Sequence, residues 1–200
     1  GAALWKGRVV AITLAAWLYP LQAIPTRANE RFPGAAVPAG TLDGTAYMAD
    51  ASYAWPDDSH RIELSYDREA IAWLWREVKG TPVIAEASLG YYSEGGMRVA
   101  SYTGLPAIIG MHELEQRPSE QVSSRDPDVT TLYTTNDLQQ LEEILARYRV
   151  SYIYVGQLER RLYARPGADS FGAAEQIGLL ARVYHNDRVD IYRVLREWGI

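Results

Sequence analysis

The chain begins with an apolar segment that is set apart from everything after it. Residues 9–24 read VVAITLAAWLYPLQAI and carry no charge; as a helix this run would extend about 24 Å, the short end of what crosses a bilayer. Lys6 and Arg8 can reach a headgroup layer, and Pro20 is expected to end or kink the helix. The pattern predicts that residues 1–24 are the end of a transmembrane helix, with a buried core helix or a secretory signal as alternatives.

The next part of the chain, residues 25–64, shows no helical or strand period and is interrupted repeatedly by Pro and Gly. Such interruptions break regular elements. We expect an irregular covering segment there, with one short helix around residues 44–51.

Regular patterns begin near Ser65. A candidate N-cap at Asp67 precedes apolar residues at helical spacing from Ile71 to Val78, and Gly80 ends this predicted helix. Further predicted elements are strands at 82–87, 98–103, 106–109 and 150–155, helices at 138–148 and 171–181, and a C-terminal hairpin of 182–185 with 189–195. Residues 65–200 therefore predict a soluble α/β domain, a Rossmann-like layered sheet of mixed strands with flanking helices.

The composition of the chain excludes several classes of function and site. The chain has 20 Lys and Arg against 25 Asp and Glu, a formal net charge of −5, which argues against a nucleic-acid partner. It has no Cys, which excludes disulfides, thiolate zinc sites, iron–sulfur clusters and a Cys nucleophile. Tyr and Trp number 14 and 6 against 2 Phe, and these amphipathic rings favour clefts and boundaries between apolar and wet regions.

Common catalytic motifs are missing from the sequence. It contains no Walker loop, no dinucleotide fingerprint after a strand and no nucleophile elbow. The HELEQ segment departs from the zincin pattern because Gln116 stands where the second His is required. His112, Glu113 and Arg117 are therefore interpreted as a polar cluster that either contacts a ligand or holds a loop.

Glu86 is the most informative acid. It follows a predicted buried strand, and in parallel sheets ligands bind outside the carboxyl ends of strands. Glu86 is expected either to bind substrate or to form an ion pair with Arg98 or Arg125, because an unpaired buried carboxylate costs several kcal/mol. Two other charged segments are interpreted structurally. Asp126-Pro127-Asp128 predicts a turn, with an acidic rim for a sugar hydroxyl or a divalent cation as the alternative. Glu159-Arg160-Arg161 predicts a solvated exit from a strand.

Several segments together resemble a known family. They are PTRANERF (25–32), TLDGTAYM (41–48), PVIAEA (82–87), RVASYTGLPAIIGMHELEQR (98–117), SSRDPDVTTLYTT (123–135) and VSYIYVGQLERRLY (150–163). In this order they resemble the C-terminal part of the YYY-type predicted polytopic membrane proteins, a family of unknown function. The family often has Trp just before the His-Glu pair; Met111 replaces it here, which puts a stacking role at that position in doubt.

The order of elements is also similar to the soluble domain that follows the membrane helices in oligosaccharyltransferase-like enzymes of the membrane glycosyltransferase C superfamily. Such enzymes move a sugar from a polyprenyl-phosphate carrier, and their catalytic acids and metal lie in loops between earlier membrane helices. The resemblance implies an extracytoplasmic domain at the cell membrane, no cofactor in this fragment, and a divalent cation only in a full-length protein. It also implies that the fragment alone is inactive, although the sequence leaves open whether the complete protein is an enzyme.

The resulting hypothesis is a domain that binds acceptor or glycan near the membrane surface. Its expected partners are the lipid bilayer, a missing membrane domain and a polyprenyl-phosphate sugar or glycan, without nucleic acid. The alternatives are a non-catalytic binding or assembly module, and a soluble enzyme that uses Glu86 and His112 as acid and base. The expected substrate-binding residues are Glu86, Tyr91, Tyr92, Arg98, His112, Glu113, Arg117 and Arg125.

Overall fold

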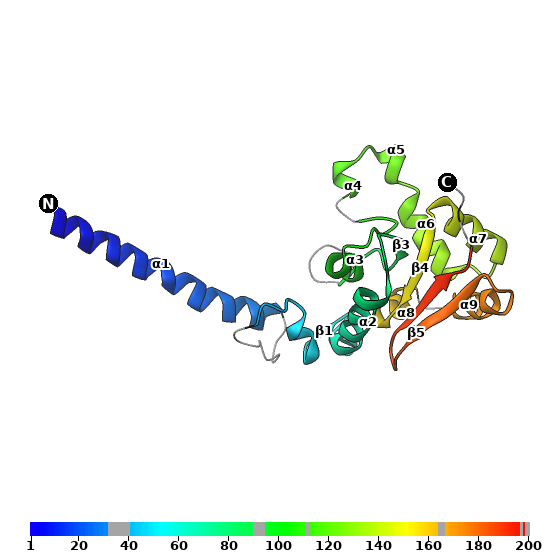
Figure 1. The fold of residues 1–200 in the computed structure, drawn as a ribbon, viewed down its shortest axis with the longest axis horizontal. Coiled ribbons are helices and arrows are strands. Elements are labelled where there is room, and N and C mark those ends of the chain that lie inside the picture. Colours follow the sequence, from blue (N-terminus) through cyan, green and yellow to red (C-terminus); the bar gives the residue numbers. More distant parts are fainter. Residues whose placement is uncertain (32–40, 90–94, 111–112, 164–166, 197, 199–200) are drawn as a thin grey trace.

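A long helix extends away from a globular α/β part (Figure 1). The computed structural model describes the chain except residues 32–40, 90–94, 111–112, 164–166, 197 and 199–200. The long helix is α1 (Ala2–Arg31), followed by the short 3-10 helix η1 (Ala46–Ala49) and by a small antiparallel hairpin of β1 (Ser52–Ala54) and β2 (Arg61–Glu63). The predicted short helix near residues 44–51 is confirmed as η1. The β1–β2 hairpin was not predicted, because Pro and Gly residues interrupt the strand pattern of this segment.

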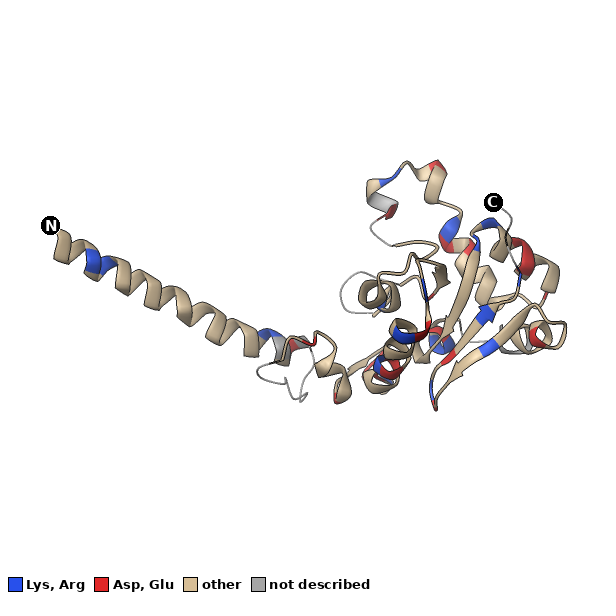
Figure 2. Cartoon of the chain, in the orientation of Figure 1, with Lys and Arg blue, Asp and Glu red and all other residues tan. Residues whose placement is uncertain are grey.

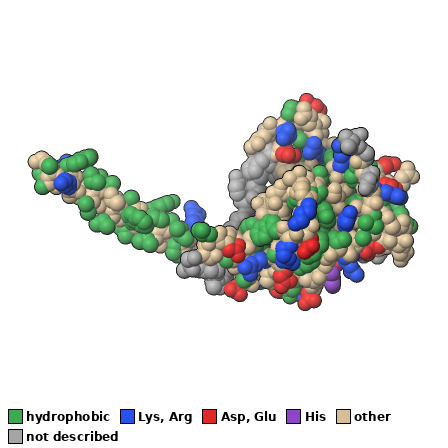
Figure 3. All heavy atoms as spheres, in the orientation of Figure 1, with side chains coloured by type: hydrophobic (Ala, Val, Ile, Leu, Met, Phe, Trp, Pro, Cys, Tyr) green, Lys and Arg blue, Asp and Glu red, His purple; other side chains and the backbone are tan. Residues whose placement is uncertain are grey.

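None of the described parts of the chain buries the apolar stretch of helix α1. An 18-residue window within Ala2–Arg27 has a mean hydropathy of 1.4 and no buried residue, and hydrophobic side chains cover the surface of the helix (Figure 3). Lys and Arg stand near its two ends, leaving the middle without charge (Figure 2). The helix continues past Pro20 and Pro25, so the loss of one backbone N–H donor at each proline does not end it. A buried core helix is not what the structure shows; length and composition suit a membrane anchor or a signal sequence.

A four-stranded mixed sheet forms the centre of the globular part, in the order β3-β4-β6-β5. Strand β3 (Val83–Ala85) is parallel to β4 (Val150–Val155), while β6 (Asp190–Val194) is antiparallel to both β4 and β5 (Leu180–His185). The predicted strands at 82–87 and 150–155 and the C-terminal hairpin are confirmed. The predicted fold class, a mixed α/β sheet with flanking helices behind one apolar helix, is also confirmed.

Helices cover both faces of this sheet. On one face α6 (Arg125–Thr134), α7 (Leu138–Arg147) and α9 (Gly167–Gln176) pack over alternate strand residues such as Ile153. On the other face α2 (Leu64–Glu77) and α3 (Arg98–Thr103) pack over Tyr154. The alternation along β4 divides the core into two layers, as the side-chain period of a strand requires.

Some predicted elements are wrong. Residues 98–103 form helix α3 instead of a strand, because a carboxylate from elsewhere in the chain caps its first N–H groups. Residues 106–109 contribute only an isolated bridge, from Ala107 to Ile84. Asp126-Pro127-Asp128, predicted as a loop turn, begins helix α6. Pro and acidic residues are favourable in the first turn of a helix.

Three short helices complete the described part of the chain. They are α4 (Glu113–Gln116), α5 (Ser119–Val122) and α8 (Gln157–Leu162). Helix α8 follows β4 directly, and its Gln157 bonds to Glu63 of the β1–β2 hairpin, with the side-chain amide donating to the Glu63 carbonyl at 2.9 Å. The hairpin therefore lies beside the carboxyl end of β4.

Candidate functional site

A buried charged network lies where β3 and β4 end. Its centre is the Arg98 guanidinium, whose Nη2 donates to Asp67 Oδ1 and to Glu159 Oε2, each at 3.1 Å. The three side chains are almost completely withdrawn from solvent. The Tyr154 ring lies 5.3 Å from the guanidinium carbon, and its hydroxyl donates to Asp67. One cation thus joins acids from α2 and α8, and it is itself carried by α3.

Glu159 fastens the loop after β3 to the start of α8. Its Oε1 accepts the Ala87 N–H and its Oε2 accepts the Gly156 N–H, both at 2.9 Å. The interpretation of Glu159 as part of a solvated strand exit is wrong, because the side chain is buried. The signal that would have found it is the spacing from Gly156 to Glu159, that of a helix N-cap and the third helical residue, where Glu reaches back to the cap N–H.

Gly156 is required by the close approach of this network. A Cβ at that position would lie 2.9 Å from Nη2 of Arg98 and 2.9 Å from Cε1 of Tyr154. Neither side chain is free to retreat, since both are buried and hydrogen-bonded. The backbone of β4 therefore ends directly against the guanidinium.

Glu86 performs a different task in the same region. Its two carboxylate oxygens accept the Val99 and Ala100 N–H groups, each at 2.7 Å, and so cap α3. The expected ion pair with Arg98 or Arg125 is not formed among the described residues, where Arg98 pairs with Asp67 and Glu159, and Arg125 with Glu113. Burial raises the pKa of Glu86 to about 7, against the opposing effect of these N–H donors and of Arg98.

The stability of the globular part is expected to depend on pH through Glu86. The pKa of Glu86 is about 7 in the fold against an ordinary 4.5, so between these values the unfolded chain loses a proton that the folded chain keeps. Stability therefore falls as pH rises, by about 2 to 3 kcal/mol between about pH 5 and pH 8. Glu86→Gln, neutral throughout, is expected to lose the part of this dependence that comes from Glu86, so its stability should change less between the two pH values than that of the unmodified chain.

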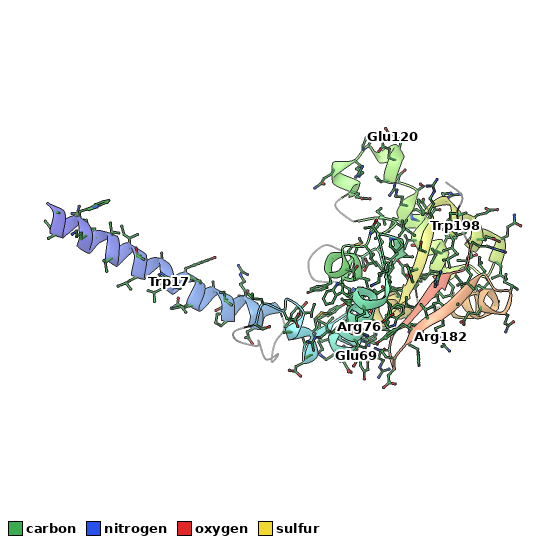
Figure 4. All side chains as sticks on the ribbon, viewed as in Figure 1. Trp17, Glu69, Arg76, Glu120, Arg182 and Trp198 are labelled. Atoms are coloured by element: carbon green, nitrogen blue, oxygen red, sulfur yellow. The ribbon has the colours of Figure 1, made fainter. Side chains whose placement is uncertain are left out.

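The measurement is urea unfolding of the full chain in detergent micelles, followed by circular dichroism at both pH values. Glu120→Gln, at an exposed position on α5 (Figure 4), is the control and should keep the pH dependence of the unmodified chain. Equal pH dependence in Glu86→Gln and the unmodified protein would contradict the prediction. Absolute stability does not decide it, because the Gln amide also removes an acceptor from α3.

The expected substrate-binding residues separate into three groups. Glu86 and Arg98 lie together but are buried, so in this structure they position α3 and the loop after β3 instead of facing a ligand. Glu113 of α4, Arg117 just after it and Arg125 of α6 form a second, partly exposed cluster. The Glu113 carboxylate lies 3.9 Å from the Arg117 guanidinium and 3.8 Å from that of Arg125. Tyr91, Tyr92 and His112 lie outside the described residues.

The sequence interpretation also missed Asp67 as a network member. It predicted an N-cap, whereas Asp67 lies inside the first turn of α2, with Glu63 as the cap residue. Burial raises the pKa of Asp67, with Arg98 and the Tyr154 hydroxyl opposing the shift. An acid among apolar helical residues, on the face that turns to the core, is the signal that was available.

An open groove lies along α2, with a volume of about 480 Å³. Helical spacing places Ser65, Arg68, Glu69 and Ala72 in one stripe along it, and Trp75 closes the end. The small Ala72 side chain leaves the hollow next to the indole. The opposite wall comes from the first described segment after α1, and includes Asp43, Thr45 and Ala49.

Trp75 is one of the exposed large apolar residues of the globular part. Its side chain is about half exposed, at 48%, while its indole N–H donates to the Tyr102 carbonyl at 3.1 Å. The bond fixes the edge of the ring and leaves the ring available to a ligand in the groove. Such a fixed aromatic face beside polar groups is typical of ligand pockets.

In the part of the chain that the structure describes, no group of three or more His, Asp and Glu side chains is arranged to hold a metal ion. No protein-family model matches the chain. No curated protein matches it either. Among solved structures, the chain is similar to the C-terminal globular domain of an oligosaccharyltransferase from Archaeoglobus fulgidus, at 10% identity and a TM-score of 0.43 over 64% of this chain and 95% of that one. A likeness of this strength says nothing about substrate.

Proposed function

We propose that the protein is a membrane-anchored extracytoplasmic domain that binds glycan next to the membrane, as part of a larger protein similar to the glycosyltransferases that use polyprenyl-phosphate sugars. The observation that carries the proposal is the Trp75 groove, one wall of which is the first described segment after the apolar helix α1. In this role the domain holds acceptor or donor sugar, and bond-making belongs to the membrane domain.

The chemistry of the groove suits a sugar. A sugar ring presents an apolar C–H face and a rim of hydroxyls. An exposed indole supplies an apolar surface for the first, and charged side chains supply strong hydrogen bonds for the second. Trp75 provides the surface, and Asp43, Arg68 and Glu69 provide the polar groups along the same groove.

Asp43 is held ready for such contacts. Its Oδ1 accepts the Thr45 N–H at 2.8 Å and the Thr45 hydroxyl at 2.6 Å, and its Oδ2 accepts from Arg68 Nη2 at 3.2 Å. The hydrogen bonds from Thr45 hold the pKa of Asp43 below its ordinary value. The carboxylate is therefore charged and oriented before a ligand arrives, which reduces the entropy lost on binding.

The buried network supports this surface from below. Asp67 belongs to the same helix as Trp75, and its bond to Arg98 joins α2 to α3. Tyr102 of α3 in turn accepts the Trp75 indole N–H. Glu86 and Arg98 thus act on the groove by positioning, while the exposed cluster of Glu113, Arg117 and Arg125 is proposed to contact acceptor or the membrane domain.

The proposal is tested with the full chain in detergent micelles on an array of oligosaccharides of mannose, glucose, galactose and N-acetylglucosamine. We expect binding to at least one of them, and Trp75→Ala should weaken it more than tenfold, the effect of removing an aromatic anchor of about 2 kcal/mol. Trp75→Phe keeps a ring face without the N–H and should fall in between. Trp17→Ala, at another exposed Trp (Figure 4), is the matched control and should bind like the unmodified chain.

Two outcomes would overturn the glycan proposal. One is an unmodified, folded chain that binds none of these sugars. The other is binding that survives Trp75→Ala unchanged, which would place the sugar elsewhere on the domain.

A further inference from the structure

A second groove crosses the sheet at the edge opposite the buried network. Because β3 and β4 are parallel and β6 is antiparallel to β4, this edge is where β3 and β4 begin and β6 ends. The groove has a volume of about 530 Å³. Its lining residues that could contact a ligand are Lys79, Arg149, Tyr152, Arg193, Arg196 and Trp198.

Positive charge gathers in this groove against the balance of the chain. Lys79, Arg149, Arg193 and Arg196 all line it, while its described lining contains no carboxylate, in a protein with a formal net charge of −5. Arg196 has an acidic partner, Glu142, at 3.2 Å. Within the described residues Arg149 and Arg193 have no ion-pair partner. A concave cluster of one sign of charge attracts ligands of the other.

The backbone at Arg149 is a second indication. Arg149 lies in the turn after α7, in the left-handed region at φ +51°, and its N–H donates to the Ala146 carbonyl at 3.1 Å. Glycine adopts this conformation freely, whereas a residue with a Cβ loses about 1 kcal/mol there. The arginine is therefore less favourable than glycine for the local fold, and residues held in this region of the backbone map cluster at ligand sites.

Two aromatic rings lie among these cations. Tyr152 pairs with Arg193 across β4 and β6, so both side chains project from the same face of the sheet. The Trp198 indole N–H donates to the Val150 carbonyl at 2.9 Å, which fixes the segment after β6 across the beginning of β4. Trp198 lies near the C-terminal end of the chain (Figure 4).

We propose that this groove binds an acidic oligosaccharide, with its carboxylate or phosphate groups on Arg149 and Arg193 and its rings against Tyr152 and Trp198. Guanidinium groups bind both kinds of anion through paired hydrogen bonds, and the aromatic rings select a ligand with apolar ring faces over a simple anion. The site shares no lining residue with the Trp75 groove and does not depend on glycan binding there.

A nucleic acid also combines anions and rings, but the observations favour the oligosaccharide. The four cations are confined to one groove, whereas a nucleic acid needs a longer basic track to neutralise its phosphates. Beyond the groove a long polyanion would meet a chain with more acidic than basic residues. A short, sparsely charged ligand avoids this repulsion.

The test uses the full chain in detergent micelles, with oligogalacturonate and a phosphorylated mannose oligosaccharide as probes, and with neutral maltohexaose and a single-stranded oligonucleotide for comparison. Binding of at least one acidic sugar is expected, weaker at about 200 mM than at about 50 mM salt. Arg149→Gln with Arg193→Gln should weaken it more than tenfold. The matched control, Arg76→Gln with Arg188→Gln, removes the same charge at two exposed sites outside the groove and should change it less than twofold.

Arg149→Gly separates binding from folding. It relieves the backbone and should therefore keep or raise the melting temperature while weakening binding by about tenfold. The proposal is overturned if neither acidic sugar binds, if the double variant binds as well as the unmodified chain, or if the oligonucleotide binds more tightly than the sugars. Comparing the affinity for the phosphorylated mannose oligosaccharide with that for oligogalacturonate shows whether the groove prefers phosphate or carboxylate.

Discussion

Replacing Arg98 with methionine is expected to lower the free energy of unfolding of the globular part by about 3 to 5 kcal/mol, the loss found when one partner of a buried ion pair is removed. Arg98 is the one cation bonded to Asp67 and Glu159 in the described network. Methionine fills a similar volume but leaves both carboxylates buried without a compensating charge. Each carboxylate then has to remain ionised at high cost or take up a proton.

The direction of a pH effect distinguishes this explanation from simple loss of packing. Arg98 lowers the pKa of Asp67 against the effect of burial. Without Arg98, Asp67 holds its proton more strongly, so acid conditions should partly rescue the variant. We expect the stability difference from the unmodified chain to be smaller at about pH 5 than at about pH 8. The measurement is urea unfolding of the full chain in detergent micelles at both pH values.

The matched control is Arg117→Met, which removes an exposed arginine of α4–α5 with a distant partner at 3.9 Å. A change of about 0.5 kcal/mol or less is expected there, as for most surface positions. If Arg98→Met cost no more than Arg117→Met, the buried network would not hold the fold together. If its cost were the same at both pH values, packing and not charge would be the cause.

The elements that the sequence predicted correctly depend on local patterns. The run VSYIYV is rich in residues that favour strands, and it forms β4. Asn186 and Asp187 separate two such runs, and they connect β5 to β6. Helix α7 follows the stripe from Leu138 to Leu145. It begins after Asp137, whose side chain accepts from the Gln139 and Gln140 N–H groups.

The errors arise where a distant residue overrides the local preference. RVASYT reads as a strand, but Glu86, more than ten residues earlier, caps its backbone and makes it α3. Single-residue propensities differ by only about 1 kcal/mol, which two charge-assisted hydrogen bonds exceed. The same limit hid the partners of Arg98, because Asp67 and Glu159 are separated from it in sequence by 31 and 61 residues.

For the candidate sites too, local features could be predicted from the sequence, and features that depend on distant residues could not. The position of Glu86 at the carboxyl end of a buried strand followed from the strand pattern, whereas its expected ion pair with Arg98 or Arg125 is not formed among the described residues. Which acids would pair with Arg98 did not follow from that pattern, since that depends on how α2 and α8 meet over β4. The Trp75 groove was hidden for a related reason: Trp75 belonged to the predicted core stripe of its helix, and only the packed structure exposes it.

Two arginines in the middle of α1 are expected to release the chain from membranes. Ile12 and Leu14 are exposed on α1, at 69% and 64%, and no described part of the chain covers that helix. An arginine at the centre of a membrane helix costs about 2.5 to 3.5 kcal/mol, so Ile12→Arg with Leu14→Arg costs about 5 to 7 kcal/mol. A helix in which an 18-residue window has a mean hydropathy of 1.4 has little insertion free energy to oppose such a cost.

The measurement is the share of the chain that stays with the membrane fraction after an alkaline carbonate wash. Leu42→Arg with Ile177→Arg adds the same charge at exposed positions of the globular part, and should stay with the membranes like the unmodified chain. An unmodified chain washed into the supernatant would contradict anchoring. So would mass spectrometry showing that the apolar segment has been removed, which is the outcome for a secretory signal. Neither result would alter sugar binding by the Trp75 groove in detergent, because α1 contributes none of its lining residues.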